Sequence, residues 1–135
     1  NTKIGGCMCQ KNQTRRIMVV EDEETTLKMV ARLLTKKFLE KNDELLLANS
    51  GQQALAEIRD KNLKIDILIT DFNMPGMDGL ELIAELDKEQ EIPIKILMSG
   101  LELAEGELPD GVLFIKKPFN ISTLLNVLPK KEKQS

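Results

Sequence analysis

The chain has 135 residues with 41% apolar and 30% charged residues and a formal net charge of −3, which describes one ordinary globular domain with a single core. It contains no histidine, tryptophan or tyrosine, which excludes histidine general bases, histidine metal sites and Ser-His-Asp triads and leaves little material for stacking nucleic-acid bases. The near-neutral charge gives no reason to expect direct binding of nucleic acid or insertion into a membrane.

The two ends of the chain differ from its middle. Residues 1–14 are polar and aperiodic, so we expect a flexible arm, and 129–135 are expected to form a basic tail after a domain over 15–128. Cys7 and Cys9 are too close for an ordinary disulfide and lack further zinc ligands. With no apolar run near the length of a bilayer span, the sequence predicts a reduced, cytoplasmic protein.

Short apolar runs alternate with amphipathic segments along the middle of the chain. The runs predict strands, and they occupy 17–20, 44–48, 65–70, 94–98 and 112–115. Apolar residues at helical spacing follow four of these runs: Leu27, Val30, Ala31, Leu34 and Phe38; Ala54, Leu55 and Ile58; Leu80, Ile83 and Ala84; Ile121, Leu124, Leu125 and Leu128. This alternation predicts an α/β fold, a doubly wound parallel sheet of five strands.

The connection over 100–111 breaks the alternation. It contains Gly106, Pro109 and Gly111, so it offers at most one or two helical turns. We expect a short helix or a loop at this place.

Charged and hydroxyl side chains come directly after the predicted strands: Glu21, Asp22 and Glu23; Asp71; Ser99, which precedes Gly100; Lys116 and Lys117. Parallel strands end at the same edge of a sheet, so these groups are expected to converge there. Clustered carboxylates repel one another unless a cation lies among them, and carboxylates with room for water and a phosphoryl oxygen suit Mg²⁺.

This set of residues can carry phosphoryl transfer without histidine, because that chemistry needs positioning and charge neutralisation. Asp71 is the candidate nucleophile, which would become an aspartyl phosphate. Glu21 and Asp22 are candidates for holding the metal, and Lys117 and Ser99 for contacting phosphoryl oxygens.

Each residue also has a simpler interpretation. Asp22 or Glu23 can cap the following helix, Asp71 can belong to a turn, Ser99 begins a common turn dipeptide, and Lys117 can be an exposed lysine before a proline. A coincidence of all four at one predicted edge is improbable, so the phosphoryl site is the preferred interpretation.

Four segments resemble the receiver domain of two-component response regulators, of the single-domain chemotaxis type. They read IMVVEDE, DILITDFNMPGMDG, ILMSG and FIKKPF, and the resemblance spans residues 16 to about 128. It implies a flavodoxin-like sheet of strand order 2-1-3-4-5. The connection after Ser99 is shorter than typical of the family, so a shortened or absent fourth helix is expected.

The resemblance also implies a metal site. Asp71 matches the phosphoacceptor, Asp22 a direct Mg²⁺ ligand and Glu21 a ligand acting through water. The backbone carbonyl of Asn73 would complete the ligand set. Glu21 stands where an aspartate is commoner in the family.

Three further matches concern switching. Ser99 matches the hydroxyl that turns toward the phosphoryl group, Phe114 the aromatic residue whose rotamer follows it, and Lys117 the lysine that binds it. The Lys117–Pro118 peptide is expected to be cis.

The implied function is a phosphorylation-driven signalling switch rather than an enzyme with an external substrate. A sensor histidine kinase or a histidine phosphotransfer protein would supply the phosphoryl group, the domain would hydrolyse its own acyl phosphate, and a downstream protein would respond. One alternative is a receiver-like docking module that works without phosphorylation. Another is a flavodoxin-type binder, which is disfavoured because Glu21, Asp22 and Glu23 would repel its phosphate.

Overall fold

A computed structural model describes residues 14–103 and 106–129. The expected arm over 1–14 and tail over 129–135 therefore lie almost wholly outside the described residues, as do Cys7 and Cys9. No helix of the described part is long and apolar enough to cross a bilayer.

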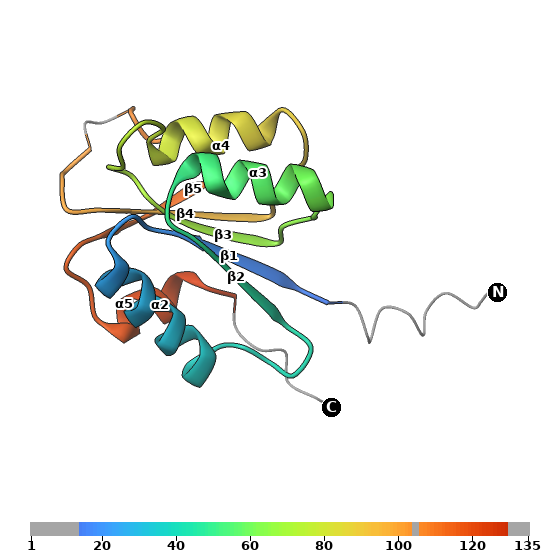
Figure 1. Ribbon diagram of the computed structural model, residues 1–135. Coiled ribbons are helices and arrows are strands. Elements are labelled where there is room, and N and C mark those ends of the chain that lie inside the picture. Colours follow the sequence, from blue (N-terminus) through green and yellow to red (C-terminus); the bar gives the residue numbers. More distant parts are fainter. Residues whose placement is uncertain (1–13, 104–105, 130–135) are drawn as a thin grey trace.

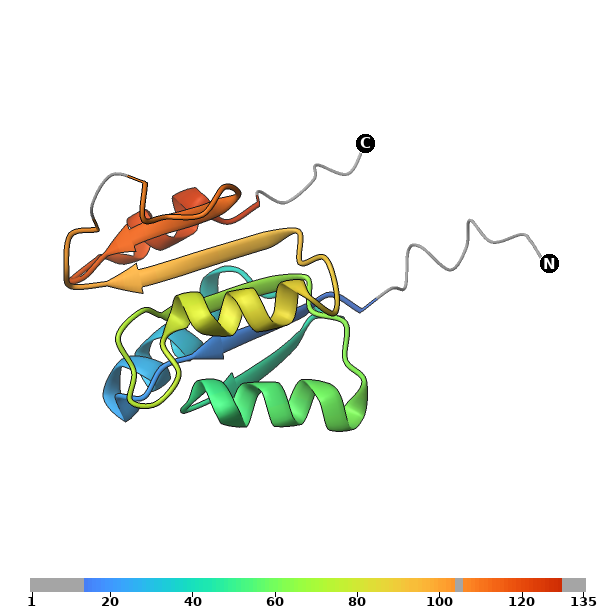
Figure 2. The same ribbon diagram turned by 90° about the horizontal axis from the view of Figure 1, so that it is seen from above.

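The described residues form a parallel five-stranded sheet of order β2-β1-β3-β4-β5, which confirms the predicted fold. Every strand pair is parallel, as the arrows of β4 and β5, orange and red-orange in Figure 2, show for one pair. The elements in chain order are β1 (Arg16–Val20), α2 (Glu24–Lys37), β2 (Glu44–Ala48), α3 (Gly51–Lys61), β3 (Ile67–Asp71), α4 (Gly79–Asp87), β4 (Ile94–Ser99), β5 (Val112–Lys116) and α5 (Ile121–Val127).

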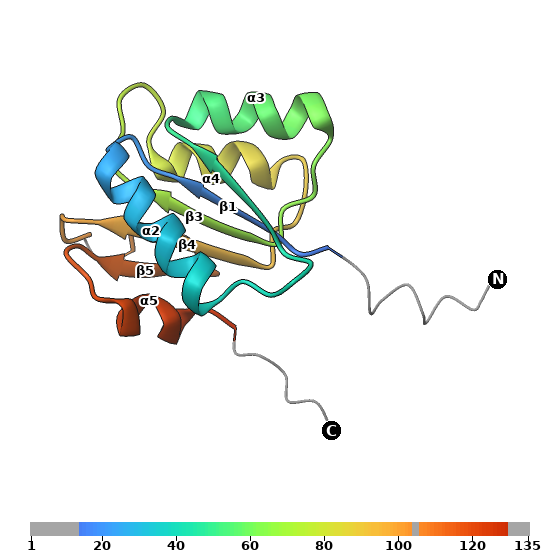
Figure 3. The same ribbon diagram turned by 60° about the horizontal axis from the view of Figure 1, so that its bottom comes forward.

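The helices form two layers, with α3 and α4 on one face of the sheet and α2 and α5 on the other (Figures 1 and 3). β3 lies at the centre and all of its residues are buried. Its side chains alternate between layers, since Leu68 packs with α3 and α4 whereas Ile67 and Ile69 pack with α2 and α5. A strand covered on both faces is apolar over most of its length, which is why continuous apolar runs predicted the strands.

One predicted helix face was wrong in detail. In α4 the buried residues are Gly79, Leu82, Ile83 and Leu86, whereas Ala84 is exposed and Leu80 is only partly buried. Apolar residues crowd this helix on more than one side, so the spacing alone did not fix which side faces the sheet.

The connection between β4 and β5 contains no helix in its described residues, 100–103 and 106–111. This agrees with the expectation that the helix between β4 and β5, the fourth in the family, is shortened or absent; the helix labelled α4 is a different one, between β3 and β4. Leu103 and Leu108 pack against the core of the α3–α4 layer, as does Phe114 of β5. An irregular segment thus covers the sheet where a crossover helix would otherwise lie.

Candidate phosphoryl-transfer site

The strand ends bring together the side chains that the sequence singled out. Glu21 follows β1, Asp71 ends β3, Ser99 ends β4 and Lys117 follows β5. Because these strands are parallel, all four positions lie at one edge of the sheet.

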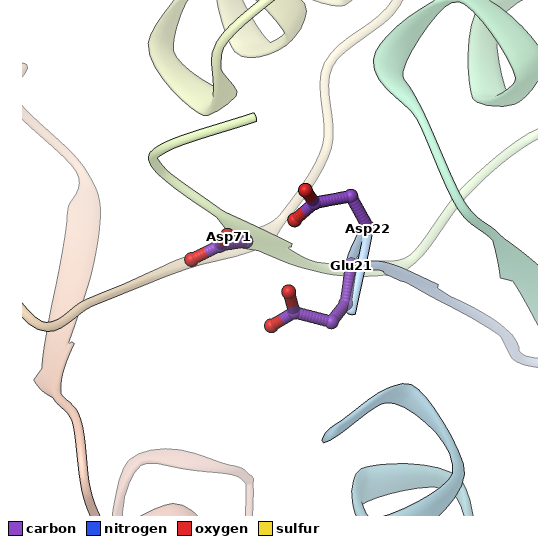
Figure 4. A group of neighbouring side chains, drawn as sticks. All are labelled: Glu21, Asp22 and Asp71. Atoms are coloured by element: carbon purple, nitrogen blue, oxygen red, sulfur yellow. The ribbon is translucent and has the colours of Figure 1, made fainter. Parts of the chain in front are cut away.

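Three carboxylates form a cluster there. Glu21, Asp22 and Asp71 each have an oxygen atom that lies within 4.8 Å of those of the other two, and Figure 4 shows the side chains gathered around one space at the ends of β1 and β3. Glu21 is 1% exposed and Asp71 5% exposed, whereas Asp22 faces solvent. Hard oxygen donors with one open side fit Mg²⁺, which keeps part of its water shell when bound to proteins.

Lys117 reaches this cluster from the end of β5, whereas the acids lie at the ends of β1 and β3. Its Nζ donates to Glu21 Oε1 at 2.7 Å and lies 3.0 Å from Asp71 Oδ1. The second carboxylate oxygen of Glu21 accepts the backbone N–H of Glu23 at 3.1 Å. The simpler interpretation of Lys117 as an exposed lysine is therefore wrong, since it connects two buried acids.

Burial dominates the ionisation of this cluster. It raises the pKa of Glu21 and that of Asp71 above their ordinary values, although the hydrogen bonds from Lys117 oppose the rise in both. For Lys117, burial alone would lower the pKa, but the hydrogen bonds to Glu21 and Asp71 outweigh it and raise the pKa. The site therefore stabilises the ammonium while holding the acids in an unfavourable setting that a divalent cation would relieve.

The hydroxyl and aromatic candidates are Ser99, the last residue of β4, and Phe114 in β5. Ser99 is 1% exposed, and its Oγ accepts the backbone N–H of Leu101 at 2.9 Å. The Ser99 carbonyl accepts the N–H of Lys117 at 2.7 Å, so the two residues are directly joined. Phe114 is half-buried in β5, and the Lys117–Pro118 peptide is cis as expected.

Asn73 lies exposed two residues beyond Asp71, in the loop before α4. Glu23 occupies the N-cap position of α2, but its side chain makes no capping hydrogen bond and instead accepts one from the Thr26 hydroxyl at 2.5 Å. The capping interpretation of Glu23 is therefore wrong as regards its side chain.

Two residues that the sequence did not single out approach the backbone of Asp71. The Thr70 hydroxyl donates to the Asp71 carbonyl oxygen at 3.0 Å, and Gly79 at the start of α4 lies against the same carbonyl. The Asp78-Gly79 pair before an apolar segment indicated only a helix start.

The comparisons with known proteins agree with this geometry. The family described as response regulator receiver domain matches residues 17–129. The chain belongs to this family.

Relatives of this receiver domain include the two-component response regulator ORR26 of Oryza sativa, 29% identical over 117 residues, which cover 83% of this chain and 19% of that protein. The transcriptional regulatory protein YrkP of Bacillus subtilis is 34% identical over 108 residues, covering 78% of this chain and 44% of YrkP. The receiver domain thus spans less than half the length of either. Chemotaxis protein CheY-3 of Vibrio cholerae is 29% identical over 125 residues and is matched over 92% of its length, with 88% of this chain covered.

Solved structures give the same result. The receiver domain of the hybrid histidine kinase CckA superposes with a TM-score of 0.66 at 35% identity, over 82% of this chain and 93% of that one. A receiver domain protein of Bacillus halodurans gives a TM-score of 0.69 at 21% identity, over 87% of this chain and 100% of that one, which supports the fold alone.

Proposed function

We propose that this receiver domain accepts a phosphoryl group on Asp71 in a Mg²⁺-dependent reaction and acts as a phosphorylation-driven switch. The observation that carries the proposal is the cluster at the ends of β1, β3 and β5, where a buried Asp71 carboxylate lies beside two further acids and a lysine ammonium. The predicted cytoplasmic location stays a prediction.

In the proposed reaction, a carboxylate oxygen of Asp71 attacks the phosphorus of a phosphohistidine. The new P–O bond forms as the P–N bond breaks, and the departing imidazole nitrogen keeps the electron pair of that bond. The chain has no histidine, so the donor would be a sensor histidine kinase or a phosphotransfer protein. Lys117 would exchange part of its contact with Asp71 for a phosphoryl oxygen, and Ser99 would donate to another.

The metal would be held by the carboxylates of Asp22 and Asp71, by Glu21 through water, and by the carbonyl of Asn73. When bound, Mg²⁺ would neutralise the negative charge of the transferring group and of the acids around it. Self-dephosphorylation would return Asp71 when water attacks the phosphorus and the acyl P–O bond breaks. A change at Ser99 and Phe114 would then carry the signal to a downstream protein.

The test is incorporation of phosphate from a small donor such as acetyl phosphate, followed by intact mass with and without Mg²⁺. We expect one phosphoryl group per chain, lost in hydroxylamine because it is an acyl phosphate, and no incorporation in Asp71→Asn. Asp60→Asn is the matched control, because Asp60 is an exposed aspartate on α3, away from the cluster.

Uptake of phosphate by Asp71→Asn at the same level would overturn the assignment of the acceptor. A folded wild-type protein that takes up no phosphoryl group and binds no beryllofluoride would instead favour the docking module.

A further inference from the structure

Gly79, the first residue of α4, is packed directly against the backbone of the proposed phosphoacceptor. A Cβ atom added to Gly79 would overlap the carbonyl oxygen of Asp71 and would lie 3.1 Å from its carbonyl carbon and 2.8 Å from Leu97 Cδ1. Backbone atoms of a central strand cannot turn aside as the end of a side chain can. Any side chain here must therefore displace either the start of α4 or the end of β3.

A second group reaches the same carbonyl oxygen. Thr70 is completely buried, and its hydroxyl donates to the Asp71 carbonyl at 3.0 Å. A buried hydroxyl needs a hydrogen-bond partner. The partner of the Thr70 hydroxyl is the peptide group between Asp71 and Phe72, where the loop that contains Asn73 begins. The Asp71 carbonyl is thus fixed by a hydrogen bond from Thr70 and by close packing from Gly79.

Gly79 also closes the loop that contains Asn73. Its backbone N–H donates to the carbonyl of Phe72 at 2.8 Å, while the N–H of Phe72 donates to Met98 in β4 at 2.7 Å. The peptide groups on both sides of Phe72 are therefore held. Thr70, Gly79 and Met98 hold the peptide before Phe72, and Gly79 holds the next one by donating its N–H to the Phe72 carbonyl. The carbonyl of Asn73 follows directly along the chain.

From these contacts we propose that Gly79 and Thr70 are positioning residues, which fix the Asp71 backbone so that the Asp71 carboxylate and the Asn73 carbonyl face a common Mg²⁺ ion. The inference rests on the proposed function, since it concerns the geometry of the same metal site. Neither residue touches the phosphoryl group. Their effect would pass through the Asp71–Asn73 segment, where a shift well below one ångström changes metal geometry.

The first test is Gly79→Ala, with Mg²⁺ titrated into the protein and binding followed by amide shifts in ¹H–¹⁵N NMR spectra. We expect the apparent dissociation constant for Mg²⁺ to rise about tenfold or more, in line with the loss seen when groups that orient metal ligands are changed. Gly100→Ala is the matched control, because nothing lies within 4 Å of a Cβ added at Gly100, the residue after β4. It should bind Mg²⁺ as the wild type does.

A Gly79→Ala protein that is destabilised but binds Mg²⁺ with wild-type affinity would overturn the proposal, since a purely structural role predicts that result. A wild-type protein that binds no Mg²⁺ would overturn the proposed function itself, so the two failures are distinguishable.

Two variants of Thr70 provide the second test, and they still test the proposal if Gly79→Ala does not fold. Thr70→Val removes the hydroxyl at similar size, and Thr70→Ser keeps it. We expect Thr70→Val to weaken Mg²⁺ binding severalfold and Thr70→Ser to restore it. Equal Mg²⁺ affinity in Thr70→Val, Thr70→Ser and the wild type would contradict the proposal.

Discussion

Glu21 and Asp71 are acids removed almost completely from water, and both contact the ammonium of Lys117. One positive charge among three carboxylates leaves the cluster net negative, and its members cannot all ionise comfortably in a low-dielectric setting. The sequence predicted which residues would meet here, because parallel strands end at one edge. It did not predict that Glu21 would bind Lys117 directly, because that contact joins side chains 96 positions apart and depends on their rotamers.

The raised pKa values lead to a prediction for the Mg²⁺-free protein. A carboxyl group whose pKa is raised on folding favours the folded state below the ordinary carboxyl pKa, and that stability is lost as pH rises through the ordinary value to the raised one. We therefore expect Asp71→Asn to raise the free energy of unfolding at neutral pH by on the order of 1 kcal/mol. Below the ordinary carboxyl pKa, about 3.9 for aspartate, the difference should vanish.

Urea unfolding followed by far-UV circular dichroism in EDTA, at several pH values, measures this effect. Asp60→Asn, at an exposed position of α3, should leave the free energy of unfolding unchanged. If Asp71→Asn is less stable than the wild type at neutral pH, the attraction of Lys117 for Asp71 outweighs the cost of burying the carboxylate.

Among the elements, the strands were the most predictable, since continuous apolar runs of Ile, Val and Leu mark strands covered on both faces. The predicted run 94–98 differs from β4, Ile94–Ser99, by one residue at its end. The orientation of α4 was less predictable because Leu80, Ile83 and Ala84 fit helical spacing as well as the buried set does. Alanine contributes little apolar area, so packing against the sheet decided in favour of Leu82 and Leu86.

The start of α4 provides a prediction at this scale. Asp78 and Glu81 form a capping box, in which the Asp78 side chain accepts the Glu81 N–H at 2.8 Å and the Glu81 side chain accepts the Asp78 N–H at 2.9 Å. We expect Asp78→Ala to lower the free energy of unfolding by about 1 kcal/mol, because the backbone N–H of Glu81 loses its side-chain partner and the capping box loses one of its two hydrogen bonds. Thermal and urea unfolding measure the loss.

Asp60→Ala in the exposed part of α3 is the control for this change, and it should leave stability unchanged or slightly raised because alanine favours helix. An Asp78→Ala variant as stable as the wild type would show that water replaces the cap without loss.

In the molecule as a whole, both apolar layers pack against the same sheet, one on each face. Leu34 of α2 is buried in one layer and Leu86 of α4 in the other, and both pack on strands that hydrogen-bond to one another. The layers could be predicted as a pair from alternating strands and helices. Which helices share a layer follows from the strand order, and that order came from the family resemblance and not from the apolar pattern.

Because the strands connect the layers, we expect the domain to unfold as one unit. Leu34→Ala and Leu86→Ala should each lower the free energy of unfolding by about 2–5 kcal/mol, since both side chains are fully buried. Circular dichroism and hydrogen exchange should report one shared transition in both variants. Loss of exchange protection in α2 and α5 alone, in Leu34→Ala, would contradict a single cooperative unit.

Lys117 has a mechanical consequence for the sheet. β5 is an edge strand that hydrogen-bonds to β4, yet through Lys117 its end is also fastened to residues at the ends of β1 and β3. The ammonium of Lys117 thus connects the edge strand β5 to the central strands β1 and β3. If Lys117 turned to a new anion at Asp71, its hydrogen bond to Glu21 would break. A chemical change at the centre of the sheet would then loosen the attachment of the end of β5 at the edge.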